Sequence, residues 1–302
     1  MGYQKHSREF KLKLVREVLA PKSNAAKVER KYKLKRGSLS SWVKKYQREI
    51  LTTTPYDIAV IPDQQVKPDV DISYIPHLTR WHDEYRPPVI VLMGDYGDMP
   101  SLGTHSKIGS KYFEGKRYQA DIDSVHRALD LQIGGINKIN GYNPTIYMIM
   151  GNHEHRITRA IENDPVHLEG LISLDDLKYE DYGIEVIPFL EILKLSGVWF
   201  SHYFYNQNSG RPYCGQIVGR IEKVGNSFVQ GHEQGLLTGH KPLADGKIHR
   251  GIVAGSCYLH DEEYKGAQGN GHWRGALMLR NVCEGNFDLR EFRIETLKES
   301  YD

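Results

Sequence analysis

The sequence has few cysteines and lacks any long apolar run. Its three cysteines, Cys214, Cys257 and Cys283, lie far apart, and no two of them form a CxxC pair. This spacing argues against a disulfide framework or a zinc knuckle and favours a reducing compartment. No apolar stretch approaches the roughly 20 residues of a membrane span, and the first residues, MGYQKHSREF, contain no apolar signal core. We therefore expect a cytoplasmic protein without a membrane span.

Acidic residues are scarce in the first fifty positions, although the whole chain of 302 residues carries a formal net charge of only +2. Residues 1–50 contain 15 lysines and arginines against 4 acidic residues, whereas the remaining 252 residues contain 25 against 34. A basic segment joined to an acidic body is typical of a nucleic-acid-binding arm. A solvated basic tail is the alternative, but the apolar residues of this segment are patterned as in folded helices.

Three short helices are predicted in residues 1–50. Ser7 can cap a first helix whose apolar residues keep helical spacing as far as Leu19, and Asn24 can cap a second. Ser38 can begin a third helix after a tight turn, which gives the helix-turn-helix pattern. Basic residues on the third helix and just before it are the candidates for contacts with DNA phosphates: Lys35, Arg36, Lys44, Lys45 and Arg48.

The stretches SREFKLKLVREVL and SLSSWVKKY resemble, in order and spacing, the helix-turn-helix of insertion-sequence transposases. The rest of the chain shows nothing of a transposase catalytic domain. The resemblance therefore implies a DNA-binding domain over residues 1–50 and does not imply transposition. A helical module that binds another protein remains the alternative.

From residue 55 the pattern changes to apolar strands alternating with amphipathic helices, which predicts an α/β domain over residues 55–302. Five apolar strands each run into a residue of a metal-binding type. The residues that follow the five strands are Asp63, Asp95, Asn152, His202 and His232. Because the carboxyl ends of neighbouring strands converge, five such ends can assemble one site. Any one of these residues alone would more simply be a turn residue.

The series DQQ, GDYGD, GNHEH, SH and GHEQ resembles the calcineurin-like metallophosphoesterase superfamily, whose order is D-x-H, G-D-x-x-D, G-N-H-[DE], H and G-H-x-H. Further stretches, such as GDYGDMPS and HWRG, look like the phage and prophage branch of that family. The resemblance implies an α/β fold of the αββα type, a two-sheet sandwich, preceded here by the small all-α helix-turn-helix domain. It also implies a site for two divalent metal ions.

The resemblance assigns metal ligands residue by residue. Asp95 would bridge the two ions and Asp63 would bind the first, while Asn152, His202 and His232 would complete the second. Two such ions clamp a phosphate, activate water at neutral pH and stabilise an in-line transition state.

The resemblance also assigns an acid to the reaction. His153 would protonate the leaving group, and Asp98 would hold its ring in orientation. The alternative for these two residues is a buried, hydrogen-bonded pair with no catalytic role.

The chain departs from the family pattern at the first metal. Gln65 and Gln234 stand where the pattern has histidines, and both positions belong to the same ion. The resulting set of Asp63, Gln65, Asp95 and Gln234 is rich in oxygen, so it favours Mn²⁺, or else Mg²⁺, over zinc. Three states stay open from the sequence: two bound ions, one ion at the second site alone, and an inactive site. The Arg-Gly pair that protein phosphatases carry after G-D-x-x-D is replaced by Met-Pro, which argues against a phosphoprotein phosphatase.

Aromatic and basic residues are mixed in stretches 111–118, 203–213 and 258–273. Such loops suit stacking on bases and contact with a phosphate backbone, although they can equally pack on one another. The candidates for contact with the substrate phosphate are Lys116, Arg117, His155 and Arg211.

Together these features predict a metal-dependent phosphoesterase that acts on nucleic acid, as a nuclease or a DNA-end-processing phosphodiesterase, and is directed to DNA by its helix-turn-helix. One alternative is a phosphoesterase for a small phosphate ester or a cyclic nucleotide. The other is a non-catalytic DNA-binding protein with a vestigial metal site. The sequence leaves the oligomeric state open, a homodimer included.

Overall fold

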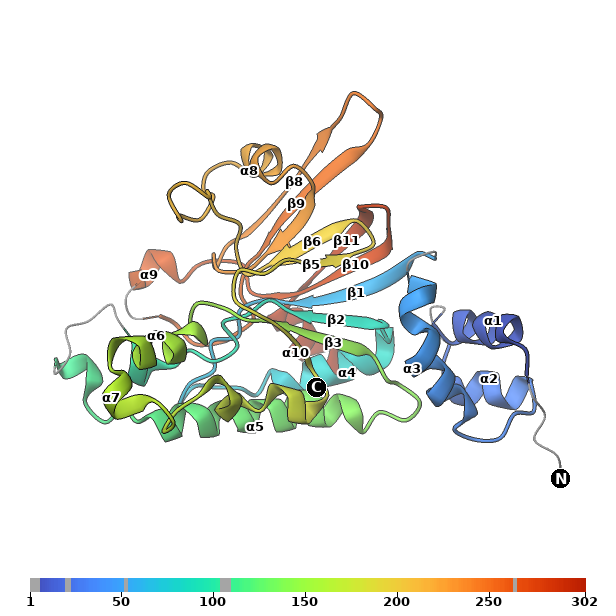
Figure 1. Cartoon of the computed structure of the whole chain (residues 1–302), viewed down its shortest axis with the longest axis horizontal. Helices are drawn as coiled ribbons and strands as arrows, with labels where there is room; N and C mark the ends of the chain where they lie inside the picture. Colours follow the sequence, from blue (N-terminus) through green and yellow to red (C-terminus); the bar gives the residue numbers. More distant parts are fainter. Residues whose placement is uncertain (1–5, 20–22, 52–53, 104–109, 263–264) are drawn as a thin grey trace.

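The computed structural model in Figure 1 describes residues 6–19, 23–51, 54–103, 110–262 and 265–302. Three helices come first: α1 (Arg8–Leu19), α2 (Ala25–Lys31) and α3 (Ser38–Leu51). Both predicted caps form, since Ser7 Oγ accepts a hydrogen bond from Phe10 N at 3.1 Å and Asn24 Oδ1 accepts one from Lys27 N at 2.9 Å. The helices enclose a small core of their own, built on Leu14, Val28 and Leu39.

Two β-sheets form the centre of the larger part. The six-stranded sheet has the order β11-β10-β1-β2-β3-β4, with β1 (Tyr56–Ile61), β2 (Val89–Leu92), β3 (Thr145–Ile149), β4 (Glu185–Ile187), β10 (Gly275–Cys283) and β11 (Asn286–Arg293). The five-stranded sheet has the order β5-β6-β7-β9-β8, with β5 (Leu193–Leu195), β6 (Val198–Ser201), β7 (Ser227–Gln230), β8 (Leu236–Pro242) and β9 (Ile248–Ala254). Strands β1 to β4 are parallel, as are β6, β7 and β9. In each sheet, therefore, several carboxyl strand ends meet at one edge.

The sheets pack face to face, and helices cover their outer faces. Buried side chains from both sheets share one core between them, including Val60 and Val91 from one and Phe200 and Val229 from the other. The outer face of the six-stranded sheet is covered by α4 (Ile75–Tyr85), α5 (Tyr118–Asn137) and α10 (Ile294–Tyr301), and that of the five-stranded sheet by α8 (Ile217–Val224). The predicted α/β sandwich is confirmed. Among the described helices, none is both long enough and apolar enough to cross a membrane.

One helix boundary differs from the sequence pattern. The alternation of strands and helices in the sequence predicts a helix over residues 71–85, but α4 begins at Ile75. The Asp71 carboxylate accepts a hydrogen bond from Ser73 N at 2.8 Å, and this local turn competes with the first helical turn.

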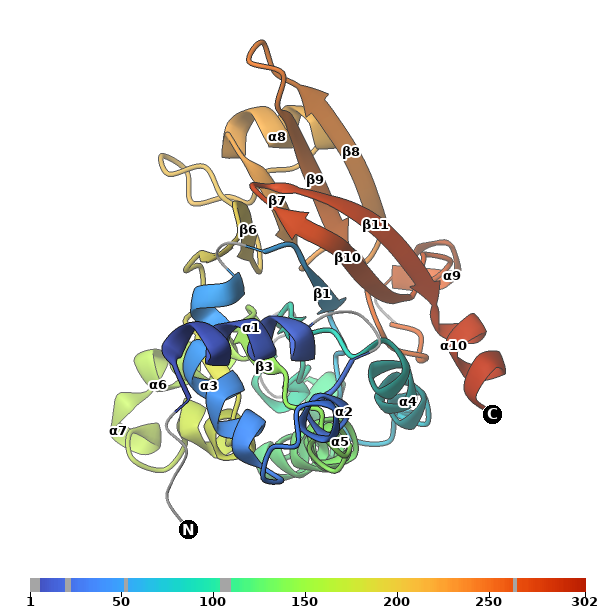
Figure 2. The same ribbon diagram turned by 90° about the vertical axis from the view of Figure 1, so that its right-hand side faces the viewer.

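The helix-turn-helix packs against the sandwich at the amino ends of β2 and β3. Gln47 on α3 is buried, and its Nε2 donates hydrogen bonds to Pro88 O at 3.0 Å and to Thr145 Oγ1 at 3.1 Å. Leu19 at the end of α1 packs against the core between the sheets. Figure 1 shows α1 to α3 gathered at one end of the molecule, whereas α6 (His155–Asn163), α7 (Pro165–Leu168) and α9 (Gly266–Gly269) lie toward the other. In Figure 2 the end with α1 to α3 faces the viewer.

We predict that Gln47→Ala lowers the free energy of unfolding by about 1–2 kcal/mol, because two hydrogen bonds between α3 and the sandwich are lost, although Thr145 N still donates to Pro88 O at 2.9 Å. Urea unfolding of the full chain measures the change. Gln119→Ala is the matched control, since the Gln119 side chain is exposed and, among the described residues, donates to Asp123 Oδ1 one turn along the same helix, at 2.8 Å. Equal stability of the two variants would show that Gln47 does not anchor the helix-turn-helix.

Candidate metal centre

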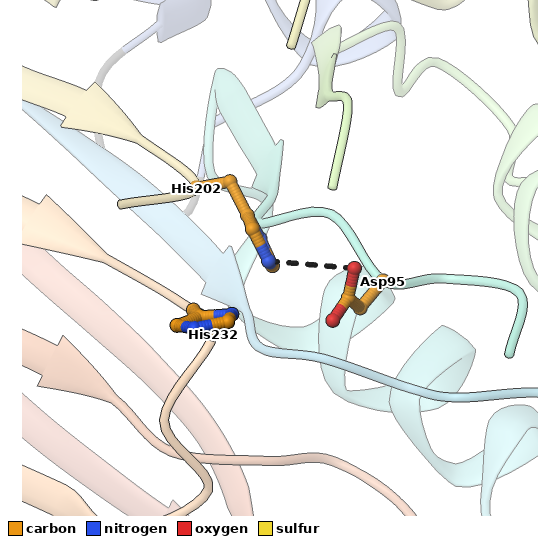
Figure 3. A group of neighbouring side chains, drawn as sticks. All are labelled: Asp95, His202 and His232. Atoms are coloured by element: carbon orange, nitrogen blue, oxygen red, sulfur yellow. Dashed lines mark ion pairs between the residues drawn. The ribbon is translucent and has the colours of Figure 1, made fainter. Parts of the chain in front are cut away.

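The strand ends bring the predicted ligands together. Asp95, His202 and His232 each offer one ligand atom, and these atoms lie within 4.8 Å of one another (Figure 3). Asp95 follows β2 of the six-stranded sheet, while the histidines follow β6 and β7 of the other. The two sheets therefore each supply part of one cluster.

His202 is fixed as a metal ligand would be. Its Nδ1 lies 2.8 Å from the Met93 carbonyl oxygen, so Nδ1 carries the proton and donates it there. Nε2 then faces two acceptors, Asn152 Oδ1 at 3.0 Å and Asp95 Oδ1 at 3.3 Å. An unprotonated nitrogen and two oxygens repel one another unless a positive charge lies among them. A backbone carbonyl that holds the far ring nitrogen is the usual arrangement around a metal-bound histidine.

The electrostatics of His202 point the same way. Burial disfavours a charged ring, but the carboxylates of Asp95 and Asp63 outweigh it and raise the pKa of His202 to about 10. The pocket around this ring therefore attracts a positive charge, which either a proton or a metal ion can supply.

His232 and Asn152 complete the cluster. His232 Nδ1 lies 2.7 Å from Asn152 Oδ1, and burial together with the nearby His202 lowers the pKa of His232 to about 4, so the ring is neutral near pH 7. The backbone before it must be glycine, because a Cβ on Gly231 would lie 2.5 Å from Asp63 Oδ1. The predicted second-metal set is thus assembled in one place.

The predicted first-metal residues also lie here and are buried. Asp63 Oδ2 and Gln65 Oε1 have no hydrogen-bond partner among the described residues. Burial, partly opposed by His202, raises the pKa of Asp63 well above its usual range. Buried oxygens of this kind are costly without a partner, and a divalent cation would satisfy them. Gln234 is buried as well, so the donor set fits an oxygen-bound ion.

The predicted acid and its orienting carboxylate are in contact. His153 Nδ1 lies 2.9 Å from Asp98 Oδ1, and His153 Nε2 points toward the cluster, 3.7 Å from Asp95 Oδ2. Burial alone would raise the pKa of Asp98, but His153, Lys67 and Arg156 hold it below the usual range. Asp98 therefore stays ionised beside the His153 ring.

Two cations that the sequence analysis did not assign to this pair are in contact with it. Arg156 NH1 donates to Asp98 O at 2.6 Å, and Arg156 NH2 lies 3.0 Å from His153 Nε2. Lys67 Nζ donates to Asp98 Oδ2 at 2.9 Å and to Glu262 Oε1 at 2.7 Å. The spacing of three residues between His153 and Arg156 is a sequence signal for a shared helix face, whereas no local pattern links Lys67 to Glu262.

Glu154 joins the two loops that carry the ligands. Its buried carboxylate accepts four backbone N–H hydrogen bonds: from Asp95 at 3.0 Å, Tyr96 at 2.7 Å, Gly97 at 3.1 Å and Gly151 at 2.9 Å. Burial and the nearby Asp95 raise the pKa of Glu154, and the four donors favour its ionised form. Gly151 has no room for a side chain, because a Cβ there would collide with Asp95. The Glu154 carboxylate and its four backbone hydrogen bonds, here called the clamp, therefore fix the two loops at their closest approach.

A second carboxylate holds the loop after β7. Glu233, between the predicted ligands His232 and Gln234, forms a two-pronged ion pair with the buried Arg220 of α8, with Arg220 NH2 at 3.0 Å from Glu233 Oε2. This pair ties the loop to the outer helix layer.

The predicted substrate-binding residues differ in their contacts and in their exposure. Lys116 lies over the Tyr112 ring, 2.9 Å from its centroid, and is close enough to interact electrostatically with Asp98. The His155 ring stacks on Phe189, with centroids 4.7 Å apart. Arg117 and Arg211 are exposed, and none of their described contacts is with the cluster. The role of each in substrate binding stays a prediction.

The predicted DNA-contacting side chains lie far from this cluster. Lys35, Arg36, Lys44 and Lys45 are exposed on and before α3. Arg48 belongs to α3, but its side chain lies outside the described part of the chain.

The N-terminal segment matches a known protein family. A transposase family model matches residues 1–68. This segment is transposase-like. The match confirms the resemblance drawn from its sequence, and it covers less than a quarter of the chain. No curated protein matches the chain.

Two solved structures that the chain resembles match it weakly. Vps29 of Chaetomium thermophilum is 8% identical, with 78% of this chain and 97% of that chain covered and a TM-score of 0.36. A second solved structure is 11% identical, with 79% and 99% covered and a TM-score of 0.35. Likenesses this weak assign no function to the chain.

We predict that Glu154→Gln lowers the free energy of unfolding by at least about 3 kcal/mol, because an amide cannot accept all four backbone hydrogen bonds. Urea unfolding measures the loss, and Glu180→Gln, at an exposed position, is the matched control. Equal midpoints for the two variants would mean that the clamp contributes nothing.

Proposed function

We propose that this protein is a metal-dependent phosphoesterase that acts on nucleic acid. The observation that carries the proposal is the meeting of Asp95, Asn152, His202 and His232 at the ends of strands from both sheets. A resemblance to calcineurin-like metallophosphoesterases in the motif order leads to the same proposal.

The donor chemistry supports two ion positions. Asp95, Asn152, His202 and His232 would hold one ion, and Asp63, Asp95, Gln65 and Gln234 would hold the other. Divalent ions bound there would neutralise a phosphate and activate water. An oxygen-rich first position favours Mn²⁺ or Mg²⁺.

The side chains next to the ligands suit a proton transfer to a leaving oxygen. With Asp98 beside Nδ1, His153 Nε2 faces the cluster. A ring protonated on both nitrogens would give its Nε2 proton to an oxygen that departs from phosphorus, once Arg156 no longer donates to that nitrogen. Arg156 and Lys67 add positive charge beside it, and Lys116 adds more within electrostatic range of Asp98. Cations arranged in this way stabilise a phosphate that gains negative charge.

The helix-turn-helix supports nucleic acid as the substrate class. Its exposed basic side chains on and before α3 can contact phosphates, and its packing against the sandwich fixes its direction. From Thr145, beside α3, to Asn152 in the cluster is about 20 Å along an extended strand. A duplex held by α3 would have to extend at least about six base pairs beyond it to reach the cluster.

The same separation favours a second candidate. Because the helix-turn-helix lies at the amino ends of the strands and the cluster at their carboxyl ends, the cluster can also accept a small phosphate ester while α3 only localises the enzyme.

We predict that His153→Ala and Asp98→Asn each lower kcat for phosphodiester hydrolysis by about 10²–10⁴-fold, as expected on losing an acid or its orienting group. Turnover of a labelled duplex and of a chromogenic phosphodiester, both with Mn²⁺, measures the loss and separates the two substrate classes. His240→Ala, at an exposed position of β8, is the control. DNA binding without any hydrolysis by the wild-type protein would instead favour a vestigial site.

We also predict that Gln65→His with Gln234→His shifts metal preference toward zinc, because two imidazoles replace two amide oxygens. Competition between Mn²⁺ and Zn²⁺, followed by elemental analysis of the protein, measures the preference. An unchanged ratio in the double variant would show that neither glutamine faces a bound ion.

A further inference from the structure

A cavity of about 660 Å³ lies between the helix-turn-helix and the sandwich, away from the metal cluster. On one side it is lined by α3, through Ser40, Ser41 and Lys44. On the other side it is lined by residues 137–143, at the end of α5 and directly after it, together with Arg86. Two segments far apart in the sequence thus share one groove.

The lining of the groove is mixed: it includes apolar side chains such as Val18, Val43 and Ile139, but its charged residues are all cations. It contains three cations, four asparagines and three serines, and no aspartate or glutamate. This is unexpected in a body in which acidic residues outnumber basic ones. Lys44 and Lys138 are exposed and form no ion pair with a described carboxylate. Amide and hydroxyl donors mixed with lysines are what proteins present to a phosphate backbone.

The third cation serves to hold the groove in shape. Arg86 is paired with Asp83 at 2.5 Å, and its NH1 donates to Asn140 O at 3.2 Å. The Tyr142 hydroxyl donates to Pro87 O at 2.8 Å, which ties down the same loop. Gly141, at φ 70°, lies against the start of α2, where an added Cβ would be 3.8 Å from the Asn24 Cβ. The loop is therefore ordered against the helix-turn-helix.

We propose that residues 137–143 of the sandwich extend the DNA-binding surface of α3, and that Lys44 and Lys138 contact the same phosphate backbone from opposite walls of the groove. This inference rests on the proposed DNA binding by the helix-turn-helix. The cavity is too small for a duplex, so it takes one backbone strand while the bases face α3. The DNA-binding unit then includes part of the sandwich in addition to residues 1–50.

Lys138→Gln tests the inference in the full chain. Affinity for a mixed-sequence duplex should fall roughly tenfold, and the slope of log affinity against log salt should become shallower by about one phosphate contact. Lys247→Gln is the matched control, because Lys247 is 73% exposed beside Asp245 on the β8–β9 hairpin, remote from α3 (Figure 1). Both variants should keep wild-type hydrolysis of a chromogenic phosphodiester.

The outcomes separate this inference from the proposed function. If the wild-type protein binds the duplex and Lys138→Gln binds with unchanged affinity and salt slope, the groove is not a DNA contact, while the helix-turn-helix remains one. If the wild-type protein binds no duplex at low salt, the DNA-binding role of the helix-turn-helix fails and the groove inference fails with it.

Discussion

The four hydrogen bonds from backbone N–H groups to the Glu154 carboxylate are the constraint on which the candidate site depends. They hold the loop after β2 against the loop after β3, with Asp95 on one and Asn152 on the other. A buried carboxylate is costly unless its oxygens are satisfied, and here the backbone satisfies them. Without this clamp the loops would be free to separate, and the cluster would lose its shape.

A second constraint is electrostatic. Asp63 and Asp95 are both buried beside His202. The negative charges of the two carboxylates repel each other, and a positive charge held among the three groups offsets this repulsion. The hydrogen bond from His202 Nδ1 to the Met93 carbonyl turns the other ring nitrogen toward Asp95 Oδ1 and Asn152 Oδ1. The fold thus presents lone pairs to one another at a point where a cation would relieve their repulsion.

Much of this site could be predicted from the sequence, because its ligands follow apolar strands whose parallel arrangement is itself predictable. The pairing of His153 with Asp98 followed from the motif order. The contacts of Lys67 with Asp98 and Glu262 could not be predicted, since 195 residues separate Lys67 from Glu262 and only the tertiary fold joins them. For the same reason the hydrogen bonds of Gln47 to Pro88 and Thr145 could not be predicted from the sequence. The sequence indicates a separate basic arm, whereas the structure packs this arm against the amino ends of the strands.

The account depends most on whether a cation occupies the cluster. Anomalous scattering from crystals grown with Mn²⁺ measures this directly. We expect a peak within coordination distance of Asp95, Asn152, His202 and His232, and a second peak beside Asp63 and Gln65. A map with no peak at either position, from crystals in which these side chains are ordered, would contradict the account.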